Sequence, residues 1–224
     1  ALKAMNKKVL KKCDSTQKLT NKLCKMGFEP VDLVTGRVNY EYTDFDLPGP
    51  LPLEWTRNWD SDSSVKGLLG HGVHCCFERA VHLVAEEGCL ALTLADGRMT
   101  VFPLLYYGES YYHPQEKLKL HRKQNGHYLL EDYAAAQYLH FNHNVQEGVW
   151  QLSFLENYNG NRIQLHYAGR FLRAITDCAG RQLTFELDKE HRITRVEVKH
   201  REVKQVLVSY AYNEAGDMIS ITDA

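Results

Sequence analysis

Histidines and cysteines that lie close together are the side chains of this sequence best suited to bind a metal ion. His71, His74, Cys75 and Cys76 fall within one short run, and zinc prefers imidazole and thiolate ligands. On a strand, however, positions three apart point to opposite faces, and no second ligand pair of matching spacing follows. The pattern favours structural or solvated histidines over a zinc site, and the same interpretation holds for the run His140-Phe-Asn-His143.

Paired carboxylates are the second group of side chains with a possible chemical role. Asp44 and Asp46 lie two residues apart, on one face of any regular strand, and such a pair could serve glycoside hydrolysis. They adjoin a Pro-Gly turn, where acids are usually solvated, and the pairs Glu86-Glu87 and Glu131-Asp132 are less specific. The sequence has no nucleophile elbow, phosphate-binding loop or dinucleotide fingerprint. We therefore expect no enzyme activity, no catalytic residue, no metal and no cofactor.

The composition is typical of a soluble protein with a sizeable core. The 224 residues are 44% hydrophobic and 25% charged, with a net charge of -1, so nothing global directs the chain to nucleic acid. No apolar run approaches the length of a membrane span, and no secretory signal peptide is recognisable. The six cysteines show no disulfide spacing, and we expect free, mostly buried thiols in a reducing compartment.

Residues 29–156 have the pattern of antiparallel β-hairpins. Apolar and polar residues alternate in short runs, and the dipeptides between the runs favour tight turns: Asp96-Gly97, Asn125-Gly126 and Glu147-Gly148. Trp55 and Trp59 lie on one face of a predicted strand and are expected to be core anchors. The polar, glycine-rich run 61–72 is predicted to be a loop. Turns this frequent indicate an all-β sandwich, barrel or solenoid.

Residues 157–224 have the pattern of a degenerate tandem β-repeat, which begins with the Asn159-Gly160 turn. The runs 169–177, 191–198 and 216–223 each start with a turn and continue as a short strand, at a spacing of roughly 20–25 residues. A two-stranded unit cannot bury its apolar face alone, so neighbouring units must stack on it. An ordinary antiparallel meander with chance similarity is the alternative interpretation.

Residues 1–28 differ from the rest of the chain. The first 26 residues carry eight lysines and one acid, which leaves the remainder with a net charge of -8. Leu2, Met5, Val9 and Cys13 follow helical spacing, and the segment is predicted to form a short basic helical arm. The arm could dock on an acidic surface, such as that of its own β body, while each single lysine is simply solvated.

Several runs resemble the Rhs/YD-repeat family of polymorphic toxins. Pro30-Val-Asp-Leu-Val-Thr-Gly36 and the run from Asp44 to Arg57 are similar to the opening of those proteins, and Ala95-Asp-Gly-Arg98 is similar to one of their hairpin turns. The runs 159–163 and 169–177 resemble their YD repeats, although the usual Tyr-Asp pair is present only in altered forms such as Tyr212-Asn213. The resemblance covers about residues 30–224.

The resemblance implies a mainly β fold, in which antiparallel hairpins build a repeat-type spiral shell around a C-terminal toxin. Residues 29–156 would be the Rhs N-terminal β region, and residues 157–224 would be YD-type repeats. The chain would be a cleaved or truncated N-terminal part of that shell, and its role would be structural: it would encapsulate or shield the toxin until delivery.

The same resemblance implies partners and a location. The partners would be the remainder of the Rhs polypeptide, including its toxin cargo, and a component of a secretion machinery such as type VI, bound through the basic arm. The protein would reside in the bacterial cytoplasm before export and be secreted as an effector. We expect the inner apolar sides of the hairpins to be covered only by further repeats.

Two other functions fit the residues less well. Tyrosine- and tryptophan-bearing sheet faces can stack on sugars, so a carbohydrate-binding β-repeat module is the alternative function. A glycosidase that uses Asp44 or Asp46 is the third hypothesis. Nucleic-acid binding would need a basic stripe with aromatic platforms, which the sequence lacks.

Overall fold

The structure is a computed structural model that describes residues 38–223. The predicted helical arm, residues 1–28, lies outside this range. Within residues 38–223 every regular element is a β-strand, and all the strand pairs are antiparallel, which confirms the predicted fold class at that level.

One sheet of eleven strands dominates the molecule. Its strands follow the order β21-β20-β19-β18-β17-β16-β15-β12-β11-β10-β9, so nearly every strand pairs with its neighbour in sequence. In chain order the bounds are β9 (Ser110–His113), β10 (Leu118–Arg122), β11 (Tyr128–Asp132), β12 (Gln137–Phe141), β15 (Phe154–Asn157), β16 (Arg162–Ala168), β17 (Phe171–Thr176), β18 (Gln182–Leu187), β19 (Ile193–His200), β20 (Val203–Tyr212) and β21 (Met218–Asp223).

Three smaller sheets complete the fold. The first has the order β1-β2-β5, the second β13-β14-β6-β7-β8, and the third is the hairpin β3-β4. Their bounds are β1 (Asn39–Leu47), β2 (Leu53–Asp60), β3 (Lys66–Gly67), β4 (Gly70–His71), β5 (Val73–Cys75), β6 (Ala80–Val84), β7 (Cys89–Thr93), β8 (Met99–Pro103), β13 (His143–Gln146) and β14 (Val149–Gln151).

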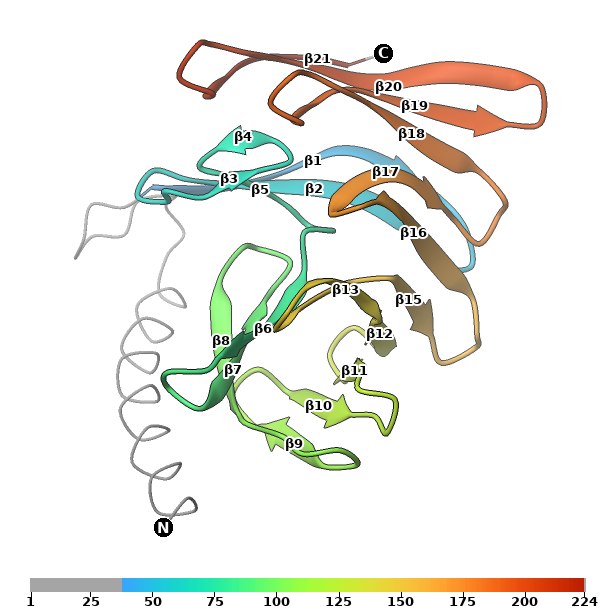
Figure 1. Ribbon diagram of the computed structural model, residues 1–224. Coiled ribbons are helices and arrows are strands. Elements are labelled where there is room, and N and C mark those ends of the chain that lie inside the picture. The colour runs from blue at the N-terminus through green and yellow to red at the C-terminus, as the bar shows by residue number, and fades with distance from the viewer. Residues whose placement is uncertain (1–37, 224) are drawn as a thin grey trace.

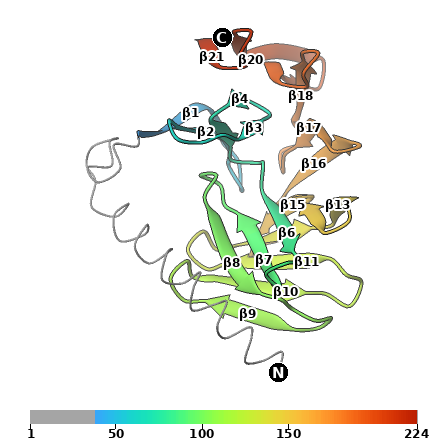
Figure 2. The ribbon, with the colours of Figure 1, turned by 60° about the vertical axis from the view of Figure 1, so that its left-hand side comes forward.

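The large sheet curves into an open arc, and the smaller sheets lie along its inner side (Figures 1 and 2). The arc follows from the right-handed twist that every strand adds to its neighbour. The β1-β2-β5 sheet faces the later strands of the arc, and the β6-β7-β8 strands face the earlier ones (Figure 1). Residue 157 falls inside the continuous large sheet, at the end of β15.

Alternating side chains of the large sheet build its half of the core. Ile163 and Leu165 on β16, and Leu183 and Phe185 on β18, are buried, while the residues between them are more exposed, as the period-2 pattern predicts. Trp55 on β2 fills the space opposite them and lies 5.3 Å from Phe185, between ring centroids. Burial of such side chains contributes roughly 1.5–3 kcal/mol each.

The expectation that only further repeats would cover the inner apolar face is wrong for most of this sheet. One continuous cluster of buried residues joins Trp55 of β2 and Phe77 of the β5-β6 turn to Leu120 and Leu183 of the large sheet. The chain can do this because residues 39–103 and 143–151 fold back across the arc as separate sheets. The described region is therefore two-layered, with its own core.

The predicted turns have their expected positions. Asp96-Gly97 joins β7 to β8, Asn125-Gly126 joins β10 to β11, Glu147-Gly148 joins β13 to β14, and Asn159-Gly160 joins β15 to β16. The run 61–72, in contrast, is more than a loop. It contains the β3-β4 hairpin, and we refer to residues 65–72 as the finger. The finger reaches from the three-stranded sheet towards β19 and the β20-β21 turn, whose backbone it contacts.

Candidate functional site: a cleft beside an edge strand

A buried polar chain joins the three-stranded sheet to β20. The indole Nε1 of Trp55 donates to the Tyr210 hydroxyl (2.9 Å), and that hydroxyl donates to Asp44 Oδ2 (2.5 Å). Arg57 Nε donates to the same carboxylate, at 2.9 Å from Oδ1. Burial, followed by the hydrogen bond to Asp44, raises the pKa of Tyr210, so its hydroxyl stays a donor. This network fixes how closely the two sheets approach.

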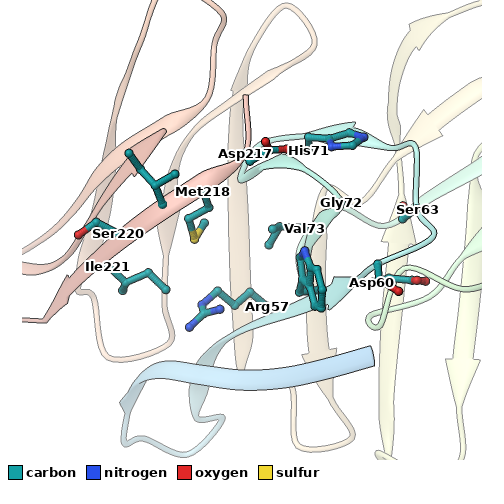
Figure 3. A pocket seen from close by; sticks show the side chains of 13 residues that line it. Arg57, Asp60, Ser63, His71, Gly72, Val73, Asp217, Met218, Ser220 and Ile221 are labelled. Atoms are coloured by element: carbon teal, nitrogen blue, oxygen red, sulfur yellow. Dashed lines mark hydrogen bonds and ion pairs between the residues drawn. The ribbon is translucent and has the colours of Figure 1, made fainter. Parts of the chain in front are cut away.

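Beyond the network the two sheets diverge and leave an open cleft of about 660 Å³ (Figure 3). One wall is the end of β2, with Arg57 and Trp59, and the other is β21, with Met218 and Ile221. Trp59 remains 39% exposed, so the prediction that it is a core anchor is wrong, whereas Trp55 is fully buried as predicted. Trp59 stays exposed because the large sheet ends opposite it.

β21 is an edge strand without the usual protection. Its neighbour on one side is β20, and no described strand pairs with its other side. Ile219 is 64% exposed and Ile221 36% exposed, and the strand contains no proline, lysine or arginine. Edge strands usually carry charges, prolines or bulges that prevent further pairing. The sequence Met-Ile-Ser-Ile-Thr-Asp is therefore suited to accept another strand.

Two other outer strands, β1 and β9, are less suited to further pairing. β1 is interrupted by a bulge between Thr43 and Phe45 and is followed by the proline-rich connector 48–52. β9, at the far end of the large sheet, has only four residues. Compared with these two strands, β21 is longer than β9 and, unlike β1, has no proline-rich connector beside it.

The predicted acidic pair does not exist as a pair. The bulge makes Asp44 the extra residue of β1, so its buried side chain lies on the same side as Arg57, while Asp46 pairs with Glu54 and is exposed. The alternation of a regular strand, on which the prediction depended, is broken at this point. The Asp44 carboxylate forms an ion pair with Arg57 and does not face the Asp46 carboxylate.

The histidines and cysteines of the first candidate metal site have separate partners. His71 Nδ1 lies 3.0 Å from Asp217 Oδ1 on the rim of the cleft, whereas His74 Nε2 lies 3.2 Å from the Leu94 carbonyl oxygen. Burial lowers the pKa of His74 to about 4. Cys75 and Cys76 are buried free thiols, as are Cys89 and, in part, Cys178. In residues 38–223 no group of three or more His, Cys, Asp or Glu could hold a metal ion.

The other candidates also have ordinary partners. His140 bonds Glu156 (3.2 Å) on the large sheet, while His143 bonds the Gly169 carbonyl oxygen (2.6 Å) from a different sheet. Of the acidic pairs, Glu131 accepts from the Tyr133 hydroxyl (2.5 Å). Asp132 caps a turn through the Ala134 and Ala135 amides, and Glu86-Glu87 lies exposed in the β6-β7 turn.

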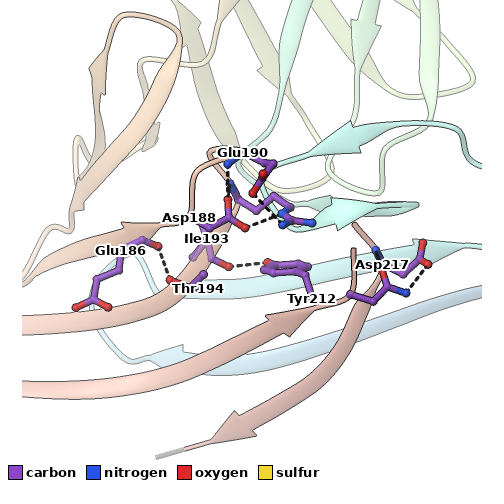
Figure 4. A network of polar contacts seen from close by, with 9 residues as sticks. Glu186, Asp188, Glu190, Ile193, Thr194, Tyr212 and Asp217 are labelled. Atoms are coloured by element: carbon purple, nitrogen blue, oxygen red, sulfur yellow. Dashed lines mark hydrogen bonds and ion pairs between the residues drawn. The ribbon is translucent and has the colours of Figure 1, made fainter. Parts of the chain in front are cut away.

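The repeat turns share a side-chain device that sequence reasoning missed. Asp177 Oδ1 accepts from the backbone N–H groups of Ala179 (2.9 Å) and Arg181 (2.8 Å), and its Oδ2 accepts from Arg181 Nε (2.6 Å). Asp188 binds Arg192 in the same way (Figure 4). Asn157 and Asn213 cap their turns with the same oxygen. The available signal was an Asp or Asn three residues before the turn glycine, or before His191 in one case.

No helix among the described residues is long and apolar enough to cross a membrane.

Comparisons with known proteins agree with this architecture. A family model described as "Domain of unknown function (DUF6531)" matches residues 28–102. "Double-stranded DNA deaminase toxin A" of Burkholderia cenocepacia (strain H111) is 29% identical over 203 residues, which are 87% of this chain and 14% of that protein. "Probable deoxyribonuclease RhsB" of Dickeya dadantii (strain 3937) is 29% identical over 199 residues, which are 85% of this chain and 13% of that protein.

Two solved structures share the fold. The N-terminal domain of effector protein SpvB from Salmonella typhimurium strain LT2 aligns with a TM-score of 0.52 at 11% identity, over 81% of this chain and 98% of that one. The TcdB2-TccC3 crystal structure aligns with a TM-score of 0.50 at 9% identity, over 83% of this chain and 16% of that one.

Residues 38–223 form an open arc of antiparallel hairpins with capped turns and one exposed edge strand, β21. The relatives agree with the resemblance of the sequence: the chain is similar to part of proteins named as an Rhs deoxyribonuclease and a deaminase toxin. It spans about one seventh of the length of the two curated relatives.

Proposed function

We propose that this chain is a wall segment of a larger Rhs-type effector and that it helps to encapsulate or shield a C-terminal toxin until delivery. Two observations support a role in a larger assembly. The chain covers only 14% and 13% of two relatives whose names describe DNA-modifying or DNA-cleaving activities. Its large sheet is an arc that does not close on itself within residues 38–223 (Figure 1). A spiral shell is the natural continuation of such an arc.

The observation that carries the proposal is the edge of β21. An exposed strand with Ile219 and Ile221, beside an apolar cleft, is an aggregation hazard for a free protein. A further hairpin of the same polypeptide would pair with β21, and its inward side chains would fill the cleft against Trp59. The partner in this proposal is the remainder of the chain's own polypeptide.

Hydrogen exchange can test this continuation. In the full-length natural polypeptide, backbone amides of β21 should exchange much more slowly than in the isolated 224-residue chain, because they gain strand partners. Amides of β9, the other edge of the large sheet, serve as the internal reference. Equal exchange at β21 in both proteins, or a natural polypeptide that ends at Ala224, would contradict the proposal.

A double substitution tests the shielding function itself. Ile219→Lys with Ile221→Lys places charges on the edge and should block pairing, so that the toxin domain of the full-length protein becomes sensitive to protease. The matched control is Tyr158→Lys with Tyr133→Lys, on exposed positions away from β21. Persistent protease resistance in the edge variant would refute containment by this wall.

The remaining parts of the proposal follow from the same role. The basic arm, residues 1–28, would dock on a component of a type VI or similar secretion machinery. The protein would be held in the bacterial cytoplasm before export and then secreted as an effector in bacterial competition. We assign this segment no catalytic activity, cofactor or nucleic-acid partner of its own, and Asp46→Asn, on the exposed side of β1, should leave any activity of the whole protein intact.

Carbohydrate binding is the second candidate, and one surface favours it. Tyr112, Tyr133 and Tyr158 are exposed, and the aromatic contacts Tyr112–Tyr133 and Tyr138–Tyr158 have ring centroids 5.9 and 5.0 Å apart. Exposed aromatic faces of this kind can stack on sugar rings. A glycan array with the 224-residue chain and its Tyr133→Ala variant would test this function, and binding that is equal in both would exclude this surface.

A further inference from the structure

The finger, residues 65–72, joins the three-stranded sheet to the repeat sheet by backbone hydrogen bonds. The Ile193 N–H, at the start of β19, donates to the Leu68 carbonyl oxygen (2.7 Å), and the His71 N–H donates to the Gly216 carbonyl oxygen (2.9 Å). Gly216 belongs to the turn between β20 and β21. The finger therefore holds the two turns that support the open edge of the sheet.

Close packing at the tip makes these contacts specific. The side chain of Leu69 is fully buried. Gly70 has φ +90°, and a Cβ at this position would lie 2.5 Å from the Gly216 oxygen and 2.9 Å from Tyr212 Cε1. Tyr212 is itself fixed, because its hydroxyl donates to the Ile193 carbonyl oxygen at 2.6 Å (Figure 4). The seat of the tip therefore leaves no room for a side chain at position 70.

A single carboxylate holds the root of the finger. Glu78 Oε1 accepts from the Leu68 N–H (2.7 Å), and Oε2 accepts from the Cys75 N–H (2.9 Å). Glu78 keeps some solvent exposure as a residue, but its carboxylate is enclosed. A Cβ at Gly67 would lie 2.6 Å from Oε1, so the finger backbone itself covers the carboxylate.

This enclosure changes the acidity of the carboxylate. Burial raises the pKa of Glu78 to about 7, against the opposing effect of the two N–H donors. Cys75, Tyr167 and Tyr212 are the titratable groups whose own pKa values respond to the Glu78 charge, and burial raises the pKa of each. Those three groups therefore stay neutral between pH 4.5 and 7.5.

Four further charged or titratable groups lie near the two ends of the finger. At the root, burial lowers the pKa of Arg79, which stays cationic, and the hydrogen bond from Cys75 lowers the pKa of Cys76. At the tip, His71 faces Asp217 at 3.0 Å, where both side chains are partly exposed. The experiment must therefore separate the effect of this tip contact from that of Glu78.

We propose that the finger is a pH-sensitive clasp, held most firmly in acid and released more readily as the medium approaches neutrality. Opening would lift Gly67 and Leu68 from Glu78 and admit water to its carboxylate. The open form would then favour the ionised carboxylate, whereas the closed form favours the protonated one. The equilibrium between the closed and the open finger shifts towards the open form as the pH rises from about 4.5, the ordinary pKa of Glu, to about 7. This inference does not depend on the proposed function.

Hydrogen exchange of the 224-residue chain between pH 5 and 7.5, corrected for intrinsic rates, tests the clasp. Protection of amides in residues 64–72 should fall with rising pH, by at most about 300-fold over the whole range set by the shift from 4.5 to about 7. Protection in the β10-β11 hairpin should not change in parallel. Glu78→Gln should abolish the pH dependence, and Glu86→Gln, on an exposed turn, should retain it.

Two results would overturn the proposal. One is finger protection that is constant with pH in the wild-type chain, or that changes only together with the β10-β11 hairpin. The other is a pH dependence that survives Glu78→Gln, or that disappears in His71→Gln, because either would place its origin at the tip. The wild-type series and the His71→Gln variant decide the matter even if Glu78→Gln does not fold.

Discussion

Removal of the Asp44 carboxylate should destabilise the chain more than most single substitutions. Its side chain is fully buried and accepts from Arg57 Nε and from the Tyr210 hydroxyl. In Asp44→Ala the guanidinium and the hydroxyl both lose their acceptor inside the interface between the three-stranded sheet and β20. The loss of one partner leaves a charge that is desolvated and unpaired.

The expected magnitude follows from this burial. One-sided loss of a buried ion pair costs about 3–5 kcal/mol, and Arg57 retains 16% exposure of its side chain, which allows some rehydration. We therefore expect a decrease of about 3 kcal/mol in the free energy of unfolding. For a chain of this size that corresponds to a decrease of roughly 6–12 °C in Tm. Urea unfolding followed by tryptophan fluorescence is the direct assay, because Trp55, one of the three tryptophans, bonds Tyr210.

The neighbouring acid provides the control. Asp46 lies on the exposed side of β1, so Asp46→Ala should change the free energy of unfolding by no more than about 0.5 kcal/mol. Tyr210→Phe should cost about 1–3 kcal/mol, and in combination with Asp44→Ala the two effects should not add. Equal stability of the two Asp variants, or strict additivity with Tyr210→Phe, would refute the network as described.

Three further substitutions test the turns, each by urea unfolding. Ala136 has φ +52°, so Ala136→Gly should relieve left-handed strain and stabilise the chain by about 0.5–1 kcal/mol, and a loss of stability would contradict this geometry. Gly70 and Gly160 both have positive φ, but an added Cβ would collide with other atoms only at Gly70. Gly70→Ala should therefore lower the free energy of unfolding by at least about 1 kcal/mol more than Gly160→Ala. Equal losses would mean that the finger tip is not closely packed. Asp177→Ala removes three hydrogen bonds, two of them to the backbone and side chain of Arg181, and should cost about 2–3 kcal/mol; a neutral effect would show that the cap is dispensable.

The strands and hairpins could be predicted because their signals are local. The alternation of apolar and polar residues in runs such as 163–167 and 183–187 indicates which face of a strand is buried. In a dipeptide such as Asn125-Gly126 the glycine adopts the positive φ that a tight hairpin turn requires, here +84°. The family resemblance also rested on local runs. These signals act over a few residues and survive without knowledge of the rest of the fold.

The parts that could not be predicted depend on contacts between distant residues. The bulge beside Asp44 separates it from Asp46, and only the position of Tyr210, 166 residues away in sequence, shows why the buried acid is tolerated. Trp55 and Trp59 share one strand face, yet only Trp55 is covered, because the large sheet ends opposite Trp59. Sequence periodicity indicates which side chains share a face, but not where the opposing sheet stops.

The three-stranded sheet and its loops contact the later strands of the large sheet at both ends of those strands. At one end the proline-rich connector accepts from Asn157 Nδ2 at the Pro50 carbonyl oxygen (3.2 Å) and from Arg181 at the Pro48 carbonyl oxygen (2.7 Å). At the other end the finger holds the turns that begin β19 and β21.

Repeat arrays need an atypical unit where the array begins, because the first repeat has no neighbour to cover its apolar face. Here that cover is supplied by residues 39–75, which place Trp55 against Phe185 and bind the turns around it. The finger still binds the turn that begins β21, but the body of that strand faces the open cleft instead of the three-stranded sheet. The cleft between β2 and β21 lies at this edge, beside the exposed side chains Ile219 and Ile221, which is why the proposed pairing of a further strand is tested there.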